Sequence, residues 1–244
     1  MSFVEVETDG DVSTVWLSRA EKRNALNREM VAELADALRC FEASSQRAVV
    51  IAARGEMAFC SGADLGEMPD VWRCVPALGL EISKPVVVAV HGQCIAGGLL
   101  FPIFADLCVA SEDANFLYPD AKLGITGGIV AALAARIPHK AAMEMIYLGR
   151  STPARRAYEM GLVNQVVPKG EHVLAAQASA AELASLAPLV LTTLKRFVQE
   201  VLPLGPAEKM LRARLELDVV AQSQDATEGT AAYSNRRKAS FRGV

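Results

Sequence analysis

Two short turns that contain glycine carry the most chemical information in this sequence. Residues 61–65 (Ser-Gly-Ala-Asp-Leu) follow the apolar run 48–52, and residues 96–100 (Ala-Gly-Gly-Leu-Leu) follow the apolar run 86–90. A strand that ends in such a turn and leads into a helix leaves backbone N–H groups unused, with the positive end of the helix dipole behind them. Two such turns that face each other could hold one developing oxyanion, whereas a single turn could simply end a strand and begin a helix.

The elements that must position these turns can be predicted from the spacing of apolar residues. Residues 3–8 and 12–17 alternate between apolar and polar types around Asp9-Gly10, which indicates a β-hairpin. Asn27 is a suitable N-cap, because apolar residues recur at helical spacing between positions 30 and 41.

Further apolar strands are predicted at 48–52, 86–90 and 107–110, with a short buried helix at 99–104. Apolar strands that are separated by helices or loops imply parallel pairing, with both faces of the sheet covered. The order of strand, turn and helix recurs around both glycine turns, which favours a coil of repeated units.

The second half of the chain is mostly helical. Helices are predicted at 129–136, 141–148, 153–160, 171–186, 188–201 and 206–224, with a short strand at 163–167. Thr152 is the predicted N-cap of the helix at 153–160, and Gly161 is the predicted residue at C′. We therefore expect an α/β core with the active site over residues 1–187 and a helical region over residues 188–244.

The composition argues against several classes of protein. Hydrophobic residues make up 52% of the 244 residues, which indicates a packed globular core rather than a disordered chain. The formal net charge is −3 with mixed signs, and the basic cluster at 236–238 is short. Nucleic acid is therefore not expected as a partner.

The cysteines and the N-terminal residues favour a cytoplasmic location. The five cysteines are odd in number and form no Cys-x-x-Cys pair, which indicates reduced thiols. Residues 1–5 lack the pattern of a signal peptide, and no apolar run reaches the roughly 18 residues of a membrane span. We expect no membrane partner, and no metal, because no His, Cys and carboxylate set has ligand spacing.

Several short motifs, in order along the chain, resemble one family. They are Arg23-Asn24-Ala25-Leu26, residues 59–65, Lys84-Pro85 with the strand and His91-Gly92 that follow, Ala96-Gly97-Gly98, Phe104-Ala105-Asp106, residues 161–164 and the closing segment 228–243. Over nearly its whole length the chain therefore resembles the crotonase (enoyl-CoA hydratase/isomerase) superfamily.

That resemblance implies an α/β fold, namely a spiral of repeated ββα units with a helical C-terminal region that mediates trimer formation. It implies an acyl-CoA substrate, no cofactor besides the coenzyme A of that substrate, and assembly as a homotrimer or a dimer of trimers. By position, the backbone N–H groups of Ala63 and Gly97 would bind the thioester oxygen, for which donors must lie about 2.7 to 3.1 Å away.

The resemblance also implies residues that bind the substrate. In the family, the segment matched by Arg23, Ala25 and Leu26 runs along the adenine and pantetheine parts of CoA, and the one matched by Asp64 and Leu65 lines the thioester. The full implied set is Arg23, Ala25, Leu26, Ser61, Asp64, Leu65, Gly98 and Leu100.

The acid and base positions depart from the family pattern. Hydratases of the superfamily use two glutamates, and the first of these positions is Leu100, which can neither orient water nor move a proton. The second is Asp120, which is one methylene shorter, and a displacement of about 1 Å can cost roughly 100-fold in rate. One carboxylate can still move a proton from the α carbon to another carbon, so isomerisation of a double bond with Asp120 as proton shuttle is favoured.

The residues leave alternatives open. They are an enoyl-CoA hydratase with an altered acid set, an acyl-CoA decarboxylase that relies on the oxyanion donors alone, and a member that binds acyl-CoA without turnover. An aroyl-CoA dehalogenase is disfavoured, because residues 124–128 lack its nucleophilic aspartate. His91 is a weaker catalytic candidate, and His139 and His172 are expected to be solvated or capping residues at helix starts.

Overall fold

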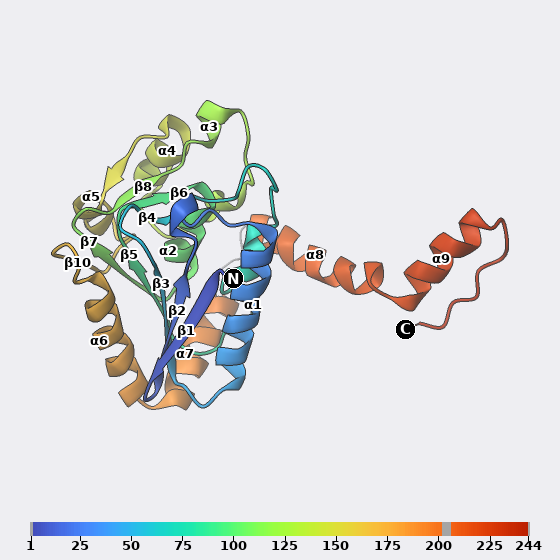
Figure 1. Ribbon diagram of the computed structural model, residues 1–244, viewed down its shortest axis with the longest axis horizontal. Helices are drawn as coiled ribbons and strands as arrows, with labels where there is room; N and C mark the ends of the chain where they lie inside the picture. Colours follow the sequence, from blue (N-terminus) through green and yellow to red (C-terminus); the bar gives the residue numbers. More distant parts are fainter. Residues whose placement is uncertain (1, 202–205, 244) are drawn as a thin grey trace.

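The computed structural model describes residues 2–201 and 206–243, which form two sheets surrounded by helices (Figure 1). The larger sheet has six strands in the order β1-β2-β3-β5-β7-β10. These strands are β1 (Val4–Asp9), β2 (Val12–Leu17), β3 (Ala48–Ala53), β5 (Val86–Val90), β7 (Leu107–Ser111) and β10 (Gln165–Val167). The predicted hairpin is confirmed, since β1 and β2 pair antiparallel, and every other pairing in this sheet is parallel.

Both faces of the larger sheet are covered, as its apolar strands predict. On β3, Val49 and Ile51 belong to the core cluster that includes residues of α1 (Arg28–Ala43), because alternate side chains point to opposite faces. Val50 and Ala52 belong to the second cluster, which α6 (His172–Ser185) completes with alanines at helical spacing. Asn27 caps α1 as predicted, since its Oδ1 accepts a hydrogen bond of 2.9 Å from the Met30 N–H.

A smaller sheet, which the sequence did not predict, carries the glycine turns. Its strands run in the order β4 (Ala58–Cys60), β6 (Gln93–Ile95), β8 (Asn115–Leu117) and β9 (Thr152–Pro153). Strands β4, β6 and β8 follow β3, β5 and β7 in the chain, so each repeat contributes one strand to each sheet. This arrangement confirms the repeated β-β-helix pattern, and it places a short second strand between each long strand and its turn.

The remaining elements of the body are short. They are the helices α2 (Leu100–Phe104), α3 (Asp120–Leu123), α4 (His139–Leu148) and α5 (Ala154–Glu159), with 3₁₀ segments η1 (Ala20–Lys22), η2 (Val71–Cys74), η3 (Ala96–Leu99) and η4 (Ile129–Ala135). The segment predicted as a helix at 129–136 is thus a 3₁₀ helix. Thr152 was wrongly predicted as an N-cap, because it pairs with Phe116 in the small sheet and Pro153 precedes α5; Gly161, with φ +80°, follows that helix as predicted.

The C-terminal helices form an arm. α7 (Pro188–Val201) lies along the body, whereas α8 (Pro206–Ala221) and α9 (Gln224–Ser234) extend away from it (Figure 1). The single helix predicted at 206–224 ends at Ala221, and Ser223 caps the separate helix α9. Among the described residues no single helix is long and apolar enough to cross a membrane; α6 and α7, bent by 106°, pass that test together by length and composition alone.

Candidate active site

The first glycine turn follows β4 and is held by the chain segment before α1. The Leu26 N–H donates to the Gly62 carbonyl and the Asp64 N–H donates to the Leu26 carbonyl, each at 2.8 Å. Gly62 has φ +91°, a region that favours glycine, and an added Cβ would lie 3.1 Å from the Gly97 nitrogen. The backbone on either side of Ala63 is therefore fixed.

The second turn packs directly against the first. A Cβ added at Gly97 would lie 3.5 Å from the Ala63 nitrogen, which places the two residues in contact. A Cβ added at Gly98 would lie 2.6 Å from the Cys60 carbonyl oxygen, so this glycine lets η3 approach β4. Gly98 thus holds the two turns together, and it is not among the residues that line the cleft.

The N–H groups of Ala63 and Gly97 are both available at this junction. Neither donates to a backbone carbonyl in the turns and loops of the described residues. Both residues line one cleft of about 370 Å³. Two adjacent, unused amide donors on one wall form the arrangement that stabilises an oxyanion.

The cleft is mostly apolar, and the sequence-predicted residues Ser61, Leu65, Leu100 and Asp120 line it together with the two turns. Its apolar wall includes Val71, Trp72, Leu100, Ile129, Val130 and Leu211. Leu100 is 5% exposed, and Asp120, the first residue of α3, is 7% exposed. The cleft therefore has a buried carboxylate but an aliphatic side chain at the other predicted acid position.

Two cleft residues beside Asp120 were not singled out from the sequence. Tyr118 is 6% exposed, and its hydroxyl lies 2.7 Å from the Thr126 Oγ1. Burial raises the pKa of Tyr118 to about 12, and the neighbouring Asp120 carboxylate contributes to the increase while the Thr126 hydroxyl opposes it. The phenol is therefore protonated at neutral pH. The sequence signal that could have identified Tyr118 is its position two residues before Asp120, the candidate acid.

The far wall comes from α8 and η2, which sequence reasoning also missed. Leu211 of α8 is 2% exposed, and Arg214 of the same helix reaches Asp70 at 3.4 Å. Arg73 joins the two elements, since it pairs with Asp218 at 2.5 Å and with Asp70 at 3.2 Å. The Arg73–Asp218 and Arg214–Asp70 contacts join residues 145 and 144 positions apart, for which no local sequence pattern exists.

The remaining predicted substrate-binding residues lie beside the cleft rather than in it. The segment with Arg23, Ala25 and Leu26 runs along the first turn, and the Ser61 N–H donates to the Arg23 carbonyl at 3.0 Å. The Asp64 carboxylate forms an ion pair with the Arg19 guanidinium, with 2.7 Å between Oδ2 and Nη1. The hydrogen bond in this pair holds the pKa of the Asp64 carboxyl below its usual range. Arg19 also donates a hydrogen bond to the Ala25 carbonyl. It therefore holds in place the segment with Arg23, Ala25 and Leu26, which the family resemblance predicts to bind the CoA part of the substrate.

The histidines stand apart from this cleft. His91 and His172 are both buried, with ring centroids 4.8 Å apart, and neither lines the cleft. His172 is the first residue of α6, at a helix start as expected, but it is buried against His91 and not solvated. His139 is exposed at the start of α4. Cys60, Cys74, Cys94 and Cys108 are free and buried, as expected, whereas Cys40 is free but exposed.

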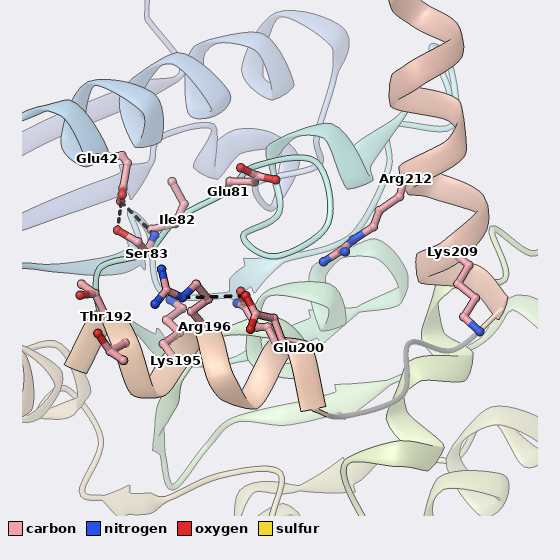
Figure 2. Close-up of a pocket in the computed structure, with 12 residues that line it drawn as sticks. Glu42, Glu81, Ile82, Ser83, Thr192, Lys195, Arg196, Glu200, Lys209 and Arg212 are labelled. Carbon is pink, nitrogen blue, oxygen red and sulfur yellow. Dashed lines mark hydrogen bonds and ion pairs between the residues drawn. The ribbon is translucent and has the colours of Figure 1, made fainter. Parts of the chain in front are cut away.

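A larger groove of about 990 Å³ lies between α7, the first part of α8 and the chain segment before β5 (Figure 2). Its walls are charged, with Lys209 and Arg212 extending from α8 and Arg196 paired with Glu200 on α7. Lys195 is bound to Asp106 at 2.7 Å. The groove adjoins the amino end of β5, whereas the two glycine turns follow the carboxyl ends of the strands. The smaller cleft is the candidate active site, because it combines unused amides, an acid and an apolar wall.

Comparison with known proteins agrees with this geometry. The model of the family enoyl-CoA hydratase/isomerase matches residues 7–244. The chain belongs to that family. A putative enoyl-CoA hydratase from Thermus thermophilus is 33% identical, over 98% of this chain and 100% of the relative. A carnitinyl-CoA dehydratase from Proteus mirabilis is 31% identical, over 98% of each chain.

Solved structures of the family share the whole fold. The carnitinyl-CoA hydratase from Mycobacterium avium superposes with a TM-score of 0.78 at 30% identity, over 100% of both chains. The predicted crotonase-type α/β fold is thus confirmed, and the protein is an acyl-CoA enzyme of the enoyl-CoA hydratase/isomerase family.

Proposed function

We propose that this enzyme moves the double bond of an enoyl-CoA thioester, with the Ala63 and Gly97 amides binding the thioester oxygen and Asp120 moving the proton. The observation that carries this proposal is the single cleft that holds both amides and Asp120, with Leu100 where a second acid would stand. One base and one oxyanion site suffice for proton transfer between carbons, whereas addition of water also needs a group to orient the water.

In this reaction the Asp120 carboxylate removes a proton from the α carbon of a 3-enoyl-CoA. The electron pair of that C–H bond moves into a dienolate, whose negative charge lies on the thioester oxygen at the two amides. The protonated Asp120 then returns the proton to the γ carbon, which leaves a 2-enoyl-CoA. The low-dielectric, apolar wall around the oxygen strengthens both hydrogen bonds.

Hydration is the second candidate, because the relatives named above are hydratases and a dehydratase. The same cleft could also support decarboxylation of a carboxylated acyl-CoA, in which the dienolate or enolate forms without a base. A member that binds acyl-CoA without turnover would show neither reaction.

The test is to incubate the protein with 3-hexenoyl-CoA in deuterated water and to follow both double-bond migration and α-deuteration by NMR. Migration with deuterium uptake supports the proposal, and its loss in Asp120→Asn assigns the base. Asp36→Asn is the matched control, since Asp36 is exposed and far along α1. Formation of a 3-hydroxyacyl product or of CO₂ from a carboxylated substrate would instead assign one of the alternatives.

We also propose assembly as a homotrimer or a dimer of trimers through residues 188–244. Large apolar side chains are exposed on α7, namely Leu189, Val190, Leu194, Phe197, Val198 and Val201. An exposed apolar surface of this kind is typical of an interface between proteins. Light scattering of the purified protein tests the stoichiometry, and a monomer would contradict the proposed assembly.

We further propose that the enzyme needs no cofactor beyond the coenzyme A of its substrate. We also propose that it is located in the cytoplasm.

A further inference from the structure

We propose that Trp72 and Leu211 limit the length of the acyl chain that the cleft accepts, and that Arg73 is a positioning residue, which holds Leu211 in this wall through Asp218 of α8. This inference rests on the proposed function only for the place of the thioester oxygen at the two amide donors. It assigns a substrate class to the enzyme, namely CoA thioesters with a short acyl chain, below the length of decanoyl.

The acyl chain leaves the oxyanion site toward η2. A Cβ added at Gly97 would lie 3.4 Å from the Val71 Cγ1, so the first residue of η2 borders the place of the thioester. The segment that the family resemblance assigns to CoA lies along the first turn instead, where the Leu26 N–H donates to the Gly62 carbonyl. With CoA at the first turn and the oxygen at the amides, the acyl chain faces the apolar wall of η2 and α8.

Trp72 and Leu211 close this wall. Both line the cleft, both are buried, and both belong to the same core cluster as Ile129 and Val130 of η4. Side chains in a protein core are packed without spare space. An acyl chain that reaches Trp72 and Leu211 can therefore be longer only if one of these side chains moves.

One face of α8 carries both Leu211 and the groups that hold it. Leu211, Arg214 and Asp218 are three and four residues apart along the helix, which places them on the same face. The Asp218 Oδ2 lies 2.5 Å from the Arg73 Nη1, and the Arg214 Nη2 lies 3.4 Å from the Asp70 Oδ2. The ion pairs therefore connect the face that carries Leu211 to η2 and to the residue before it.

Arg73 is the centre of this group of contacts. Its Nε lies 3.2 Å from the Asp70 Oδ2, and its Cζ lies 4.6 Å from the centroid of the Trp72 ring. A guanidinium can bind carboxylates at its edge while its plane stacks on an aromatic ring. Arg73 thus contacts Trp72 directly and holds Leu211 through Asp218, so one side chain connects both members of the wall.

The binding of saturated acyl-CoAs measures the length limit. Each methylene that finds room in an apolar site adds about fourfold in affinity. The affinity of the wild type is expected to rise from butanoyl-CoA through hexanoyl-CoA and octanoyl-CoA, and to stop rising before decanoyl-CoA. Leu211→Ala makes room for further methylenes and is expected to raise the affinity ratio of decanoyl-CoA to butanoyl-CoA about tenfold.

Variants of the ion pair test the positioning role. Arg73→Gln and Asp218→Asn are each expected to raise the same ratio about twofold to fivefold, because Leu211 is then held less firmly. The double variant should not exceed Arg73→Gln alone, since both substitutions remove the same interaction. An increase in salt from about 0.05 M to about 0.5 M should raise the ratio in the wild type but not in Arg73→Gln.

Isothermal titration calorimetry of the full-length protein gives these affinities without turnover. Arg39→Gln is the matched control, because Arg39 pairs with the exposed Asp36 on α1 and lies outside the cleft. A structural defect would lower the affinity for every chain length equally.

Two results would overturn the inference and leave the proposed function intact. They are a wild-type affinity that still rises at decanoyl-CoA, and an affinity ratio that Arg73→Gln leaves unchanged. Failure of the wild type to bind any acyl-CoA would overturn the proposed function together with the inference.

Discussion

The peptide nitrogen of Ala63 lies within van der Waals reach of the position that a Cβ would occupy on Gly97, at 3.5 Å. These residues follow different strands of the small sheet, β4 and β6, and their contact brings two unused amide donors to one wall of the cleft. A side chain at position 97 could be accommodated by the fold, but it would occupy the space beside the Ala63 N–H. A substitution at Gly97 should therefore lower the catalytic rate without lowering the stability of the fold.

Gly97→Ala is expected to lower kcat by about 100-fold while the melting temperature changes little. The added methyl group meets its neighbours at 3.4 Å or more, which is ordinary contact, yet it stands where the substrate oxygen must approach. Loss of one oxyanion donor typically costs about 100-fold to 1000-fold in kcat. Isomerase kinetics and a thermal melt of the same preparation check this, and a variant with full activity would remove Gly97 from the oxyanion site.

Gly98→Ala is expected to lower the stability of the fold, in contrast to Gly97→Ala. Its Cβ would lie 2.6 Å from the Cys60 carbonyl oxygen, which is backbone and cannot swing aside. Overpacking of this kind costs about 1 to 3 kcal/mol. Urea unfolding should show a lower midpoint for Gly98→Ala than for Gly97→Ala, and equal midpoints would contradict the close approach of η3 to β4.

Leu100→Glu is expected to increase the rate at which the enzyme adds water to a 2-enoyl-CoA by tenfold or more. The new carboxylate would face the cleft at the position where the family's hydratases carry a glutamate, so two acids could share the water. The loss of the enoyl thioester absorbance measures the reaction. Leu100→Gln is the matched control, since it adds a polar group without a proton-transfer group, and equal rates in the two variants would argue against the acid.

The buried His172 should make the stability of the protein depend on pH. Burial, followed by the neighbouring His91, lowers the pKa of His172 to about 4 from its ordinary value of 6.5. The unfolded chain therefore binds a proton as the pH falls through 6.5, while the folded chain stays neutral until about pH 4. This contribution to stability is complete above pH 6.5 and is lost as the pH falls from 6.5 to about 4.

Thermal melts of the wild type and of His172→Phe between pH 7.5 and pH 4.5 check this expectation. The variant should lose less stability on acidification than the wild type, because it has no imidazole to protonate. His139→Gln, at an exposed position, should behave like the wild type. Parallel curves for the wild type and His172→Phe would show that other groups determine the pH dependence.

The sequence predicts the long elements well because their apolar side chains repeat with a regular period. The hairpin, α1 and the strand Val86–Val90 are clear in this respect. The strands of the small sheet have two or three residues, too few for a period to show, and so Thr152 was taken for a helix cap. In the segment 129–135 the buried apolar residues lie three positions apart, at 129 and 132 and at 130 and 133. Over so few residues this spacing fits both an α-helix and a 3₁₀ helix, so the sequence did not distinguish the two types.

The candidate site also contains residues that local sequence patterns predict and residues that only the tertiary structure brings into place. Ala63, Gly97 and Asp120 were placed by motifs that are local in the chain, and the structure brings these residues to one cleft. Gly98 was assigned to the substrate, although its lack of a Cβ serves the packing against Cys60. Trp72, Leu211 and Arg214 were not predicted, because the wall that they form depends on where α8 meets η2 and not on residues that are neighbours in the chain.

The contribution of α8 to the cleft also fixes when the cleft can form during synthesis. Met210, Leu211 and Arg214 close a cleft whose other lining residues lie between positions 61 and 130, so the ribosome must release most of the chain before the pocket is complete. At about 5 to 20 residues per second, the two sheets have time to fold first. We therefore expect the nascent chain to form its two glycine turns before its binding cleft is enclosed.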